Sequence, residues 1–449
     1  MNVAKERDLA FLDAFIPSSA KWLSSVTCGE LLPRGAFASL LFVDMNDFVK
    51  MTTNDDLSGG AKPLSPKVIR SVVYGRRGLS DASALRSEFM RKVLKEYFCR
   101  LTEIVGAYDG SVVAFLGDAI LVAWFVDDEH NAEHDIADDI VIATKRANSC
   151  AKSILDHVHG SVLHEAVTVH LKLMVSSGRV TLLPVWISSS ARAVLVFGEA
   201  MDELRSIKNS MGSGKVVLSS SSQNLLRRAI NVHESKFSGG FKSHRSSRLV
   251  DFIPSHVVDA FRDGLISFDG IKSVTCVCTV AFIRFQPIAD DVHCVLACVH
   301  QIHRSIEQHR GTMLQIVVDE IGHSCLCAFG LYLAPKRASA KRGVRCVRQI
   351  LALLQQITIK ASCGVSTGVV NFGSACVANS ARHSELTLIG VPVILAARLA
   401  ETSRDGSVAL DEETLIGASA LMTTATFVRK EVRLKGFERA VSTFVVSFN

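Results

Sequence analysis

The sequence contains no block of lysine and arginine residues long enough to follow a phosphate backbone. Its formal net charge of +6 is spread over the whole chain, which argues against nucleic-acid binding. The one dense charged run, at 127–135, is acidic, and we interpret it as a solvated loop before a helix. His130 and His134 lie one helical turn apart in this run, and their spacing alone does not predict a metal site.

Long apolar segments are also missing, because no run reaches the roughly 20 residues that a membrane helix needs. The longest, 112–126, is interrupted by Gly117 and Asp118. The first residues are amphipathic and of mixed charge, unlike a signal peptide. We therefore expect a soluble, cytoplasmic protein with no transmembrane segment.

The 12 cysteines form no CxxC motif and have no histidines at zinc-binding spacing. Cys276 with Cys278, and Cys325 with Cys327, alternate as residues on one face of a strand do. We interpret the cysteines as small buried hydrophobic residues in a reducing compartment.

A series of predicted elements occurs twice in the 449 residues. The strand that ends at Asp44 is followed by a helical stretch at 84–110 and by two strands around the Gly117–Asp118 turn. The second half repeats this order over 273–330. We therefore predict two α+β domains with mixed sheets. The predicted boundaries are an N-terminal helical extension at 1–35, a first domain at 36–222, a Ser/Gly-rich basic linker at 223–272 and a second domain at 273–449.

The motifs "FVDMNDF", "GDAILVAWF" and "LIGVPVILAARL" resemble the catalytic domains of class III nucleotidyl cyclases. The tandem arrangement resembles the catalytic portion of soluble, bicarbonate-responsive adenylyl cyclases, over residues 36–449. The resemblance implies two ferredoxin-like, palm-type domains with mainly antiparallel sheets and flanking helices. They pair within the chain as a pseudo-heterodimer, with ATP in the groove between them.

In this family the ribose 3′-oxygen attacks the α-phosphorus of ATP and pyrophosphate leaves, with the help of two Mg²⁺ or Mn²⁺ ions. The resemblance assigns the metal ions to Asp44 and Asp118, since such hard cations prefer carboxylate oxygens. The structural alternative is that Asp44 ends a strand and Asp118 forms a hairpin turn.

The resemblance also assigns the groups that hold the nucleotide. They are Phe48, Thr52 and Lys172 for the phosphates, Gln315 and Thr387 for the base, and Arg398 for the charge that develops on the α-phosphate. Three of these residues also have an ordinary structural interpretation. Lys172 could face solvent, Thr387 could be a plain strand residue, and Arg398 could lie on a helix surface.

Three positions depart from the family pattern. Asp47 stands where a glycine is usual, and Gln315 replaces a lysine that donates to adenine. An amide can serve adenine or, when flipped, guanine. Ile394 replaces the asparagine that orients the ribose, and misplacement of this kind can lower the rate on the order of a hundredfold.

The reciprocal site between the domains is expected to be inactive, because we align Ile283 with Asp44. In the soluble branch this second site binds bicarbonate through an arginine and a lysine. Arg205 matches the arginine, but Ala114 stands at the lysine position, which weakens the expectation of bicarbonate regulation.

The leading hypothesis is an adenylate cyclase in intracellular signalling. The first alternative is a catalytically weakened pseudo-cyclase that acts as a nucleotide-sensing or scaffold module. The second is another metal-dependent nucleotidyl transfer on the same architecture.

Overall fold

The computed structural model describes most of the chain. The described residues are 12–26, 33–46, 48, 81–127, 136–164, 167–187, 191–228, 247–267, 270–286, 292–318, 322–331, 336–376, 384–419, 425–437 and 439–448. Asp47, Thr52, His130 and His134 lie outside them.

The first half of the molecule, from β1 to α8, is built on a six-stranded sheet of order β2-β3-β1-β6-β7, with β8 paired to β6. Its strands are β1 (Arg34–Met45), β2 (Ser111–Leu116), β3 (Ala119–Asp127), β6 (Leu171–Trp186), β7 (Arg192–Phe197) and β8 (Val216–Leu218). Its helices are α5 (Asp81–Ala107), α6 (Ile136–Val158), α7 (Glu199–Ile207) and α8 (Ser220–Arg228). Smaller elements are β4 (Val162–Leu163), β5 (Val167–Thr168) and η3 (Lys208–Ser210).

The second half, from β11 to β18, is built on an eight-stranded sheet of order β12-β13-β11-β14-β16-β18-β17, with β15 paired to β14. Its strands are β11 (Val274–Phe285), β12 (Thr312–Val318), β13 (His323–Phe329), β14 (Ala361–Cys376), β15 (Glu385–Ile389), β16 (Val408–Asp411), β17 (Ala425–Val432) and β18 (Val441–Phe448). Its helices are α10 (Val292–Gln308), α11 (Lys336–Gln356), α12 (Val391–Thr402) and α13 (Glu412–Gly417).

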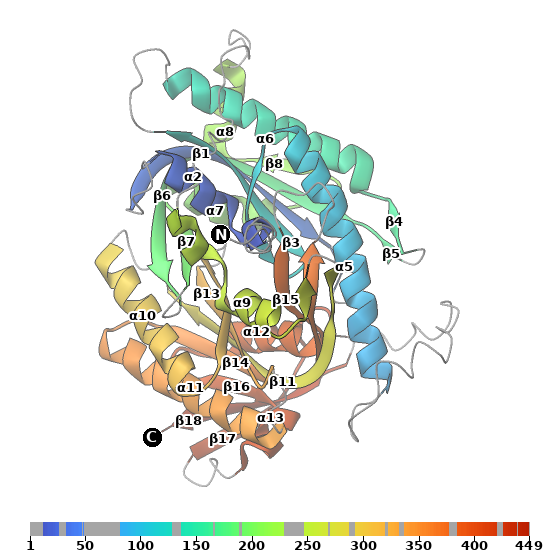
Figure 1. The fold of residues 1–449 in the computed structure, drawn as a ribbon, viewed down its shortest axis with the longest axis vertical. Coiled ribbons are helices and arrows are strands. Elements are labelled where there is room, and N and C mark those ends of the chain that lie inside the picture. The colour runs from blue at the N-terminus through green and yellow to red at the C-terminus, as the bar shows by residue number, and fades with distance from the viewer. Residues whose placement is uncertain are drawn as a thin grey trace, which may run out of the picture.

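The two sheets repeat one another in order and in register. The order β2-β3-β1-β6 corresponds to β12-β13-β11-β14, and β8 and β16 are the parallel strands in each. Both sheets also have an irregularity at the same point, between Val112 and Ala114 and between Met313 and Gln315. The predicted α+β class with mainly antiparallel sheets and flanking helices is therefore confirmed (Figure 1). The domain boundaries stay a prediction.

A buried hydroxyl network marks the repeat independently. Ser39 and Ser177 face each other across β1 and β6, with their Oγ atoms 3.0 Å apart, and Ser177 Oγ lies 2.9 Å from Ser222 Oγ at the start of α8. In the second half Thr279 and Thr367 occupy the same register across β11 and β14. Their Oγ1 atoms are 2.9 Å apart, and Thr367 Oγ1 lies 2.8 Å from Thr414 Oγ1 in α13. These pairs align the two halves residue by residue.

The remaining described elements pack against both halves, and the helix at 18–26 contacts β2, β6 and β7 of the first half. These remaining elements are η1 (Asp13–Phe15), α2 (Ser18–Val26), η6 (Ser247–Phe252), α9 (Ser255–Arg262), β9 (Ile266–Ser267) and β10 (Gly270–Ile271). Phe15 and Phe252 are buried in one cluster with Val280 of β11. The Nε2 atom of His256 donates to the carbonyl of Leu386 at 2.9 Å, which ties α9 to β15.

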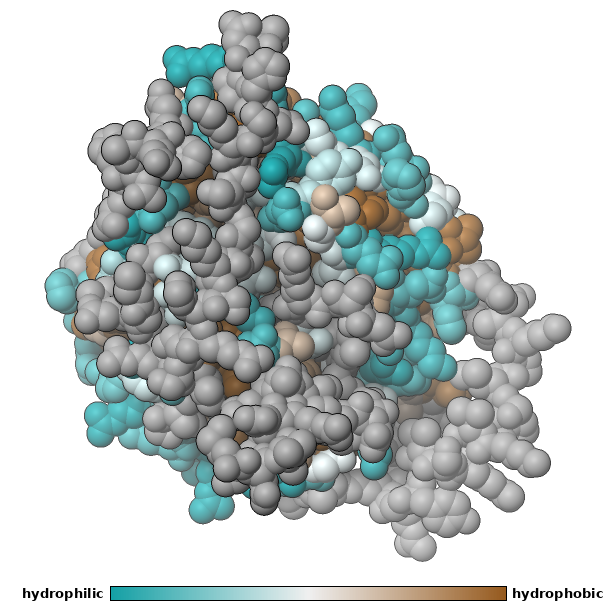
Figure 2. All heavy atoms as spheres, turned by 45° about the horizontal axis from the view of Figure 1, so that its top comes forward, coloured by the Kyte–Doolittle hydropathy of each residue, from teal (hydrophilic) through white to brown (hydrophobic). Residues whose placement is uncertain are grey.

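Figure 2 shows the surface of the described residues from one side. On the face shown in Figure 2 it is mainly hydrophilic, with apolar residues in small groups. Among the described residues, no helix is both long enough and apolar enough to span a bilayer.

Gly364 brings α12 unusually close to β14. A Cβ atom at this position would lie 2.0 Å from the carbonyl oxygen of Ala396 and 2.5 Å from the amide nitrogen of Ala400. Both are backbone atoms of α12, so they cannot move aside without moving the helix. The close contact of α12 with β14 is therefore possible only because residue 364 is glycine.

We expect Gly364→Ala to destabilise the fold by about 1–3 kcal/mol, because overpacking against a backbone forces the helix away from the sheet. Urea unfolding measures this change. Gly106→Ala is the control, since a Cβ there has no heavy atom within 4 Å, and alanine suits a helix better than glycine. Equal midpoints for the Gly364→Ala variant and the parent protein would contradict the tight helix contact.

Candidate functional site

A cavity of about 280 Å³ lies between the two halves. The first half contributes Asp44, Phe48 and Asp118, and the second contributes Gln315, Thr387 and Arg398. Six of the residues singled out in the sequence thus line one cavity. Lys172 and Arg205 are not among the described residues that line it.

Strand pairing brings Asp44 and Asp118 to the same end of the first sheet. Asp44 lies directly opposite Ala119 on β3 and opposite Lys172 on β6. Asp118 precedes Ala119 in the turn from β2, where Gly117 has a φ of 75° that suits glycine. Asp118 is therefore adjacent to the residue that faces Asp44, and Lys172 is the cross-strand neighbour of Asp44 on the other side.

The charges of the two acids interact strongly. Burial and the negative charge of Asp44 raise the pKa of Asp118 to about 8, although its backbone hydrogen bond and the charges of Arg398 and Lys435 lower it. The two carboxylates, both of half-buried residues, thus repel each other. The pKa of Tyr97, on α5, is also raised well above its ordinary value, by burial first and then by Asp44 and Asp118.

Gln315 reaches across the interface between the halves. Its Nε2 atom donates a hydrogen bond to the main-chain carbonyl of Phe115 on β2. Because a carbonyl only accepts, this bond fixes the amide nitrogen toward β2. The other half of the amide, Oε1, is left as the acceptor. The orientation of Gln315 is therefore set by the first half of the molecule.

Arg398 lies on α12 and is engaged by a neighbour on the same helix. Its Nη1 atom donates to both carboxylate oxygens of Glu401, each at 2.9 Å, and the carboxylate also lines the cavity. The Nε atom of Arg398 is buried without a hydrogen-bond partner among the described residues. Ile394, one turn earlier on α12, also lines the cavity and contributes an apolar side chain to its wall.

Phe48 is buried and packs in the cluster that contains Met90 and Leu94 of α5. Its side chain therefore belongs to the wall of the cavity. The proposed phosphate turn continues from Phe48 to Thr52, and that part lies outside the described residues.

The reciprocal end of the interface has a different charge pattern. The register makes Arg284, opposite Ser324 and Ser362, the equivalent of Asp44, and it makes His323 the equivalent of Asp118. The alignment of Asp44 with Ile283 is thus wrong by one residue, and this error moves the aligned residue to the other face of the strand. The expectation that this end lacks the first metal carboxylate is unchanged.

Arg205 lies near this reciprocal end. It forms an ion pair with Asp202 on its own helix. Burial and, second, the charge of Arg205 together lower the pKa of His323 to about 4. Ala114 lines a separate, smaller cavity of about 110 Å³. Anion binding by Arg205 stays a prediction.

Sequence reasoning did not identify Glu401, Lys208 or Lys435, all of which line the larger cavity. Lys435 lies in the turn between β17 and β18, followed by Gly436 with a φ of 90°. In the sequence, the pair Lys435–Gly436 between the two strands indicates a turn, and this was the available signal for Lys435. The spacing of three residues between Arg398 and Glu401 on one helix was the signal for Glu401.

Two halves of this topology, paired around one cavity, form the fold of class III nucleotidyl cyclases. No model of a protein family matches the chain. The chain is 22% identical to adenylate cyclase type 10 of Rattus norvegicus over 413 residues, which cover 80% of this chain and 23% of the relative. The Homo sapiens protein of the same name is 22% identical over 411 residues, with the same coverage. The chain thus spans less than a quarter of the length of these relatives.

A solved structure extends the likeness over both halves. It is described as a class III adenylyl cyclase-like ATP-binding protein from Pseudomonas aeruginosa. It covers 91% of this chain and 94% of its own chain, at 10% sequence identity and a TM-score of 0.50. The resemblance to class III cyclases of the soluble adenylyl type is confirmed by these relatives.

The acid pair predicts a pH dependence of stability in metal-free buffer. The pKa of Asp118 rises from 3.8 to about 8 on folding, so the folded chain binds more protons than the unfolded chain between these values. The free energy of unfolding therefore falls as the pH rises from about 4 to about 8. Asp118→Asn removes this contribution, and the variant is expected to unfold at a higher temperature than the parent above about pH 8.

Thermal unfolding with a chelator present, followed from acid to alkaline pH, measures the difference between the two proteins. Asp156→Asn, at an exposed position on α6, is the control and should follow the parent curve. Parallel curves for the Asp118→Asn variant and the parent at all pH values would show that the two acids do not repel each other.

Proposed function

We propose that this chain is an adenylate cyclase that converts ATP to cyclic AMP and pyrophosphate. The observation that carries the proposal is the shared cavity, in which Asp44 and Asp118 of one half face Gln315, Thr387 and Arg398 of the other. The relatives named above, adenylate cyclases type 10, support the same reaction class.

The reaction is an internal substitution at the α-phosphorus. The 3′-oxygen forms a bond to this phosphorus, the bond to the β-phosphate oxygen breaks, and the 3′-hydroxyl proton is released. Negative charge develops on the α-phosphate and the leaving pyrophosphate. Arg398 offers a fixed positive charge for the α-phosphate, and we assign Lys435 and Lys172 to the leaving group, because Lys435 lines the cavity and Lys172 is the cross-strand neighbour of Asp44.

The donor set fits a divalent cation. Among the described residues, no group of three or more His, Cys, Asp and Glu side chains forms a complete metal cage. Mg²⁺ needs no such cage, because it is commonly held by one or two carboxylates together with substrate phosphates and water. Asp44 and Asp118 match this pattern, and their repulsion is relieved by a cation. When bound there, Mg²⁺ or Mn²⁺ supplies Lewis acidity for the 3′-hydroxyl and neutralises the triphosphate.

Base recognition is assigned to Gln315 and Thr387. With the Gln315 nitrogen held by Phe115, the Oε1 atom is the group that accepts from a base. An acceptor matches the amino group of adenine and also the N1–H and amino groups of guanine. The hydroxyl of Thr387 both donates and accepts, so the preference for adenine rests on the resemblance.

A second candidate is a nucleotide-binding module with little turnover. Ile394 leaves the ribose without a hydrogen-bond partner at that position, and Glu401 competes with phosphate for the Arg398 guanidinium. The similar Pseudomonas aeruginosa protein is described as ATP-binding. These observations favour binding without efficient chemistry.

Bicarbonate regulation is not part of the proposal. Ala114 contributes no charge to the smaller cavity, and Arg205 is paired with Asp202.

The activity assay separates these candidates. Purified chain with ATP and Mn²⁺ is expected to release cyclic AMP, and Asp44→Ala is expected to reduce the signal to background, because one carboxylate alone holds the cations poorly. Asp156→Ala is the control, and the amount of cyclic AMP and cyclic GMP is measured by mass spectrometry. The enzyme proposal fails if neither ATP nor GTP gives a cyclic product. An increase in thermal stability with ATP, about 2.7 kcal/mol at a hundredfold excess over Kd, would then support the binding module.

Ile394→Asn is expected to raise kcat, up to roughly a hundredfold, because the amide can hold the ribose and orient the 3′-oxygen. KM should change little, since the base and phosphate contacts are unaltered. Ile394→Val keeps the site apolar and should give no gain. Steady-state kinetics with ATP and Mn²⁺ measures both variants. If the Ile394→Asn variant folds and binds ATP but has the same kcat as the parent, then Ile394 is not the residue that limits the rate.

A further inference from the structure

Helix α5 belongs to the first half of the chain but also contacts the second half. Figure 1 shows it running from the upper half of the molecule down beside the lower one. Its Met90 and Leu94 line the large cavity. The Ser87 hydroxyl, which lies 3.0 Å from the Ser83 carbonyl within α5, also lies 3.5 Å from the carbonyl oxygen of Val369 on β14. The N-terminal part of α5 is therefore a bridge between the two halves.

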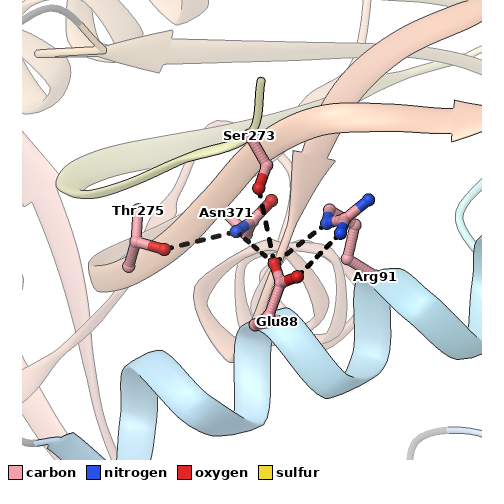
Figure 3. A network of polar contacts seen from close by, with 5 residues as sticks. All are labelled: Glu88, Arg91, Ser273, Thr275 and Asn371. Atoms are coloured by element: carbon pink, nitrogen blue, oxygen red, sulfur yellow. Dashed lines mark hydrogen bonds and ion pairs between the residues drawn. The ribbon is translucent and has the colours of Figure 1, made fainter. Parts of the chain in front are cut away.

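Glu88 is the centre of a polar network at this bridge (Figure 3). Its carboxylate accepts two hydrogen bonds from Arg91, at 2.7 and 2.9 Å, within α5. From the second half, Asn371 Nδ2 donates to it at 3.0 Å and the Ser273 hydroxyl at 3.5 Å. Asn371 Nδ2 also lies 3.2 Å from Thr275 Oγ1. One carboxylate thus joins α5 to both β14 and the start of β11.

The network is shielded from solvent. Asn371 is 1% exposed, and the Glu88 side chain is 28% exposed. Burial raises the pKa of Glu88, but the hydrogen bond and charge of Arg91 outweigh it, so that this pKa lies below its ordinary value. Glu88 is therefore an anion near neutral pH. Hydrogen bonds to a charged acceptor are stronger than neutral ones, so the contact with Asn371 is worth more than an exposed pair.

The network leads directly to the cavity. Asn371 lies opposite Ile389 on β15, and Ile389 lines the cavity. Gly390 follows and precedes α12, and a Cβ atom there would lie 3.3 Å from the hydroxyl oxygen of Ser87. The contact of α5 with the second half thus lies beside the segment from which the helix of Arg398 starts.

We propose that Glu88 is a positioning residue that sets the distance between the two walls of the cavity. By binding Asn371, it fixes the half that carries Asp44 and Asp118 against the half that carries Thr387 and Arg398. The expected effect of Glu88 on kcat rests on the proposed cyclase function. Its expected effect on the packing of the two halves rests on the geometry alone.

The first test removes the carboxylate. Glu88→Ala is expected to lower kcat by about tenfold with KM within about twofold, because looser walls misplace the reacting groups while the nucleotide contacts remain. Hydrogen exchange of the full chain should become faster in residues 386–398 and in the first turns of α5. The exchange readout needs no catalytic activity, so it tests the proposal even if the chain makes no cyclic nucleotide.

Glu96→Ala is the matched control. Glu96 lies on the same helix and is also paired with an arginine, Arg100, at 2.6 Å, but its other contact is the backbone nitrogen of His164 within the first half. This variant should leave kcat and the exchange of 386–398 unchanged. If both variants accelerate exchange of 386–398 equally, Glu88 contributes only to general stability and the proposal is overturned.

An exchange of partners gives the second test. Asn371→Asp alone brings two carboxylates together, and it is expected to lower kcat and to speed exchange at 386–398. When Asn371→Asp is combined with Glu88→Gln, the amide donor lies on α5 and the carboxylate acceptor lies on β14. Both kcat and the exchange rate at 386–398 should then return toward those of the parent. A double variant no better than Asn371→Asp alone, or a Glu88→Ala variant indistinguishable from the parent in both readouts, would overturn the proposal.

Discussion

The pairing of β1 with β3 and β6 is the constraint on which the site depends. Antiparallel pairing fixes which residues lie opposite each other, and here it brings Lys172, Asp44 and Ala119 into one row across the sheet. Because Asp118 directly precedes Ala119 in the turn that follows β2, it lies at the same end of the sheet as Asp44. A slip of one residue would turn Asp44 to the face covered by α5 and α6, where the neighbours of β1 are apolar. The electrostatics of the cavity is thus a consequence of strand register.

The second half supplies its groups through a different physical device, close helix packing. Because Gly364 has no side chain, α12 lies directly on β14, and Arg398 projects from it into the cavity. Glu401 binds the guanidinium, and its side chain is 33% exposed. Exposed pairs of this kind contribute about 0.2–1 kcal/mol. Glu401 therefore holds the guanidinium in one place, and so weak a pair is only a modest competitor for an anion that enters the cavity.

The sequence was enough to predict the features that follow from motif order and residue pattern. It was not enough to predict those that depend on strand register or on main-chain contacts. Repeated motif order was enough to predict the two similar sheets, and it placed Asp44, Asp118, Thr387 and Arg398 in sequence contexts that the structure brings to one cavity. A run of strand-forming residues does not by itself show whether Ile283 or Arg284 is the counterpart of Asp44, because a shift by one residue leaves the run intact although it changes the face. The partner of Gln315 is a main-chain carbonyl, which has no sequence signature. Lys435 comes from a turn far along the chain, and only the folded arrangement brings it near Asp118.

A comparison of the two halves at equivalent positions distinguishes the residues that the fold requires from those that belong only to the cavity. Both contain the buried hydroxyl network around Ser177 and Thr367, because a buried polar group without its partner is costly. At the strand ends they differ, since the second half has Arg284 and His323 where the first has Asp44 and Asp118. The sheet therefore folds without an acid pair at this end. In the first half, burial and then the charge of Asp44 raise the pKa of Asp118 to about 8, which destabilises the metal-free chain near neutral pH. Perturbed acids of this kind cluster at functional sites, and a bound cation is the ligand that would convert their repulsion into attraction.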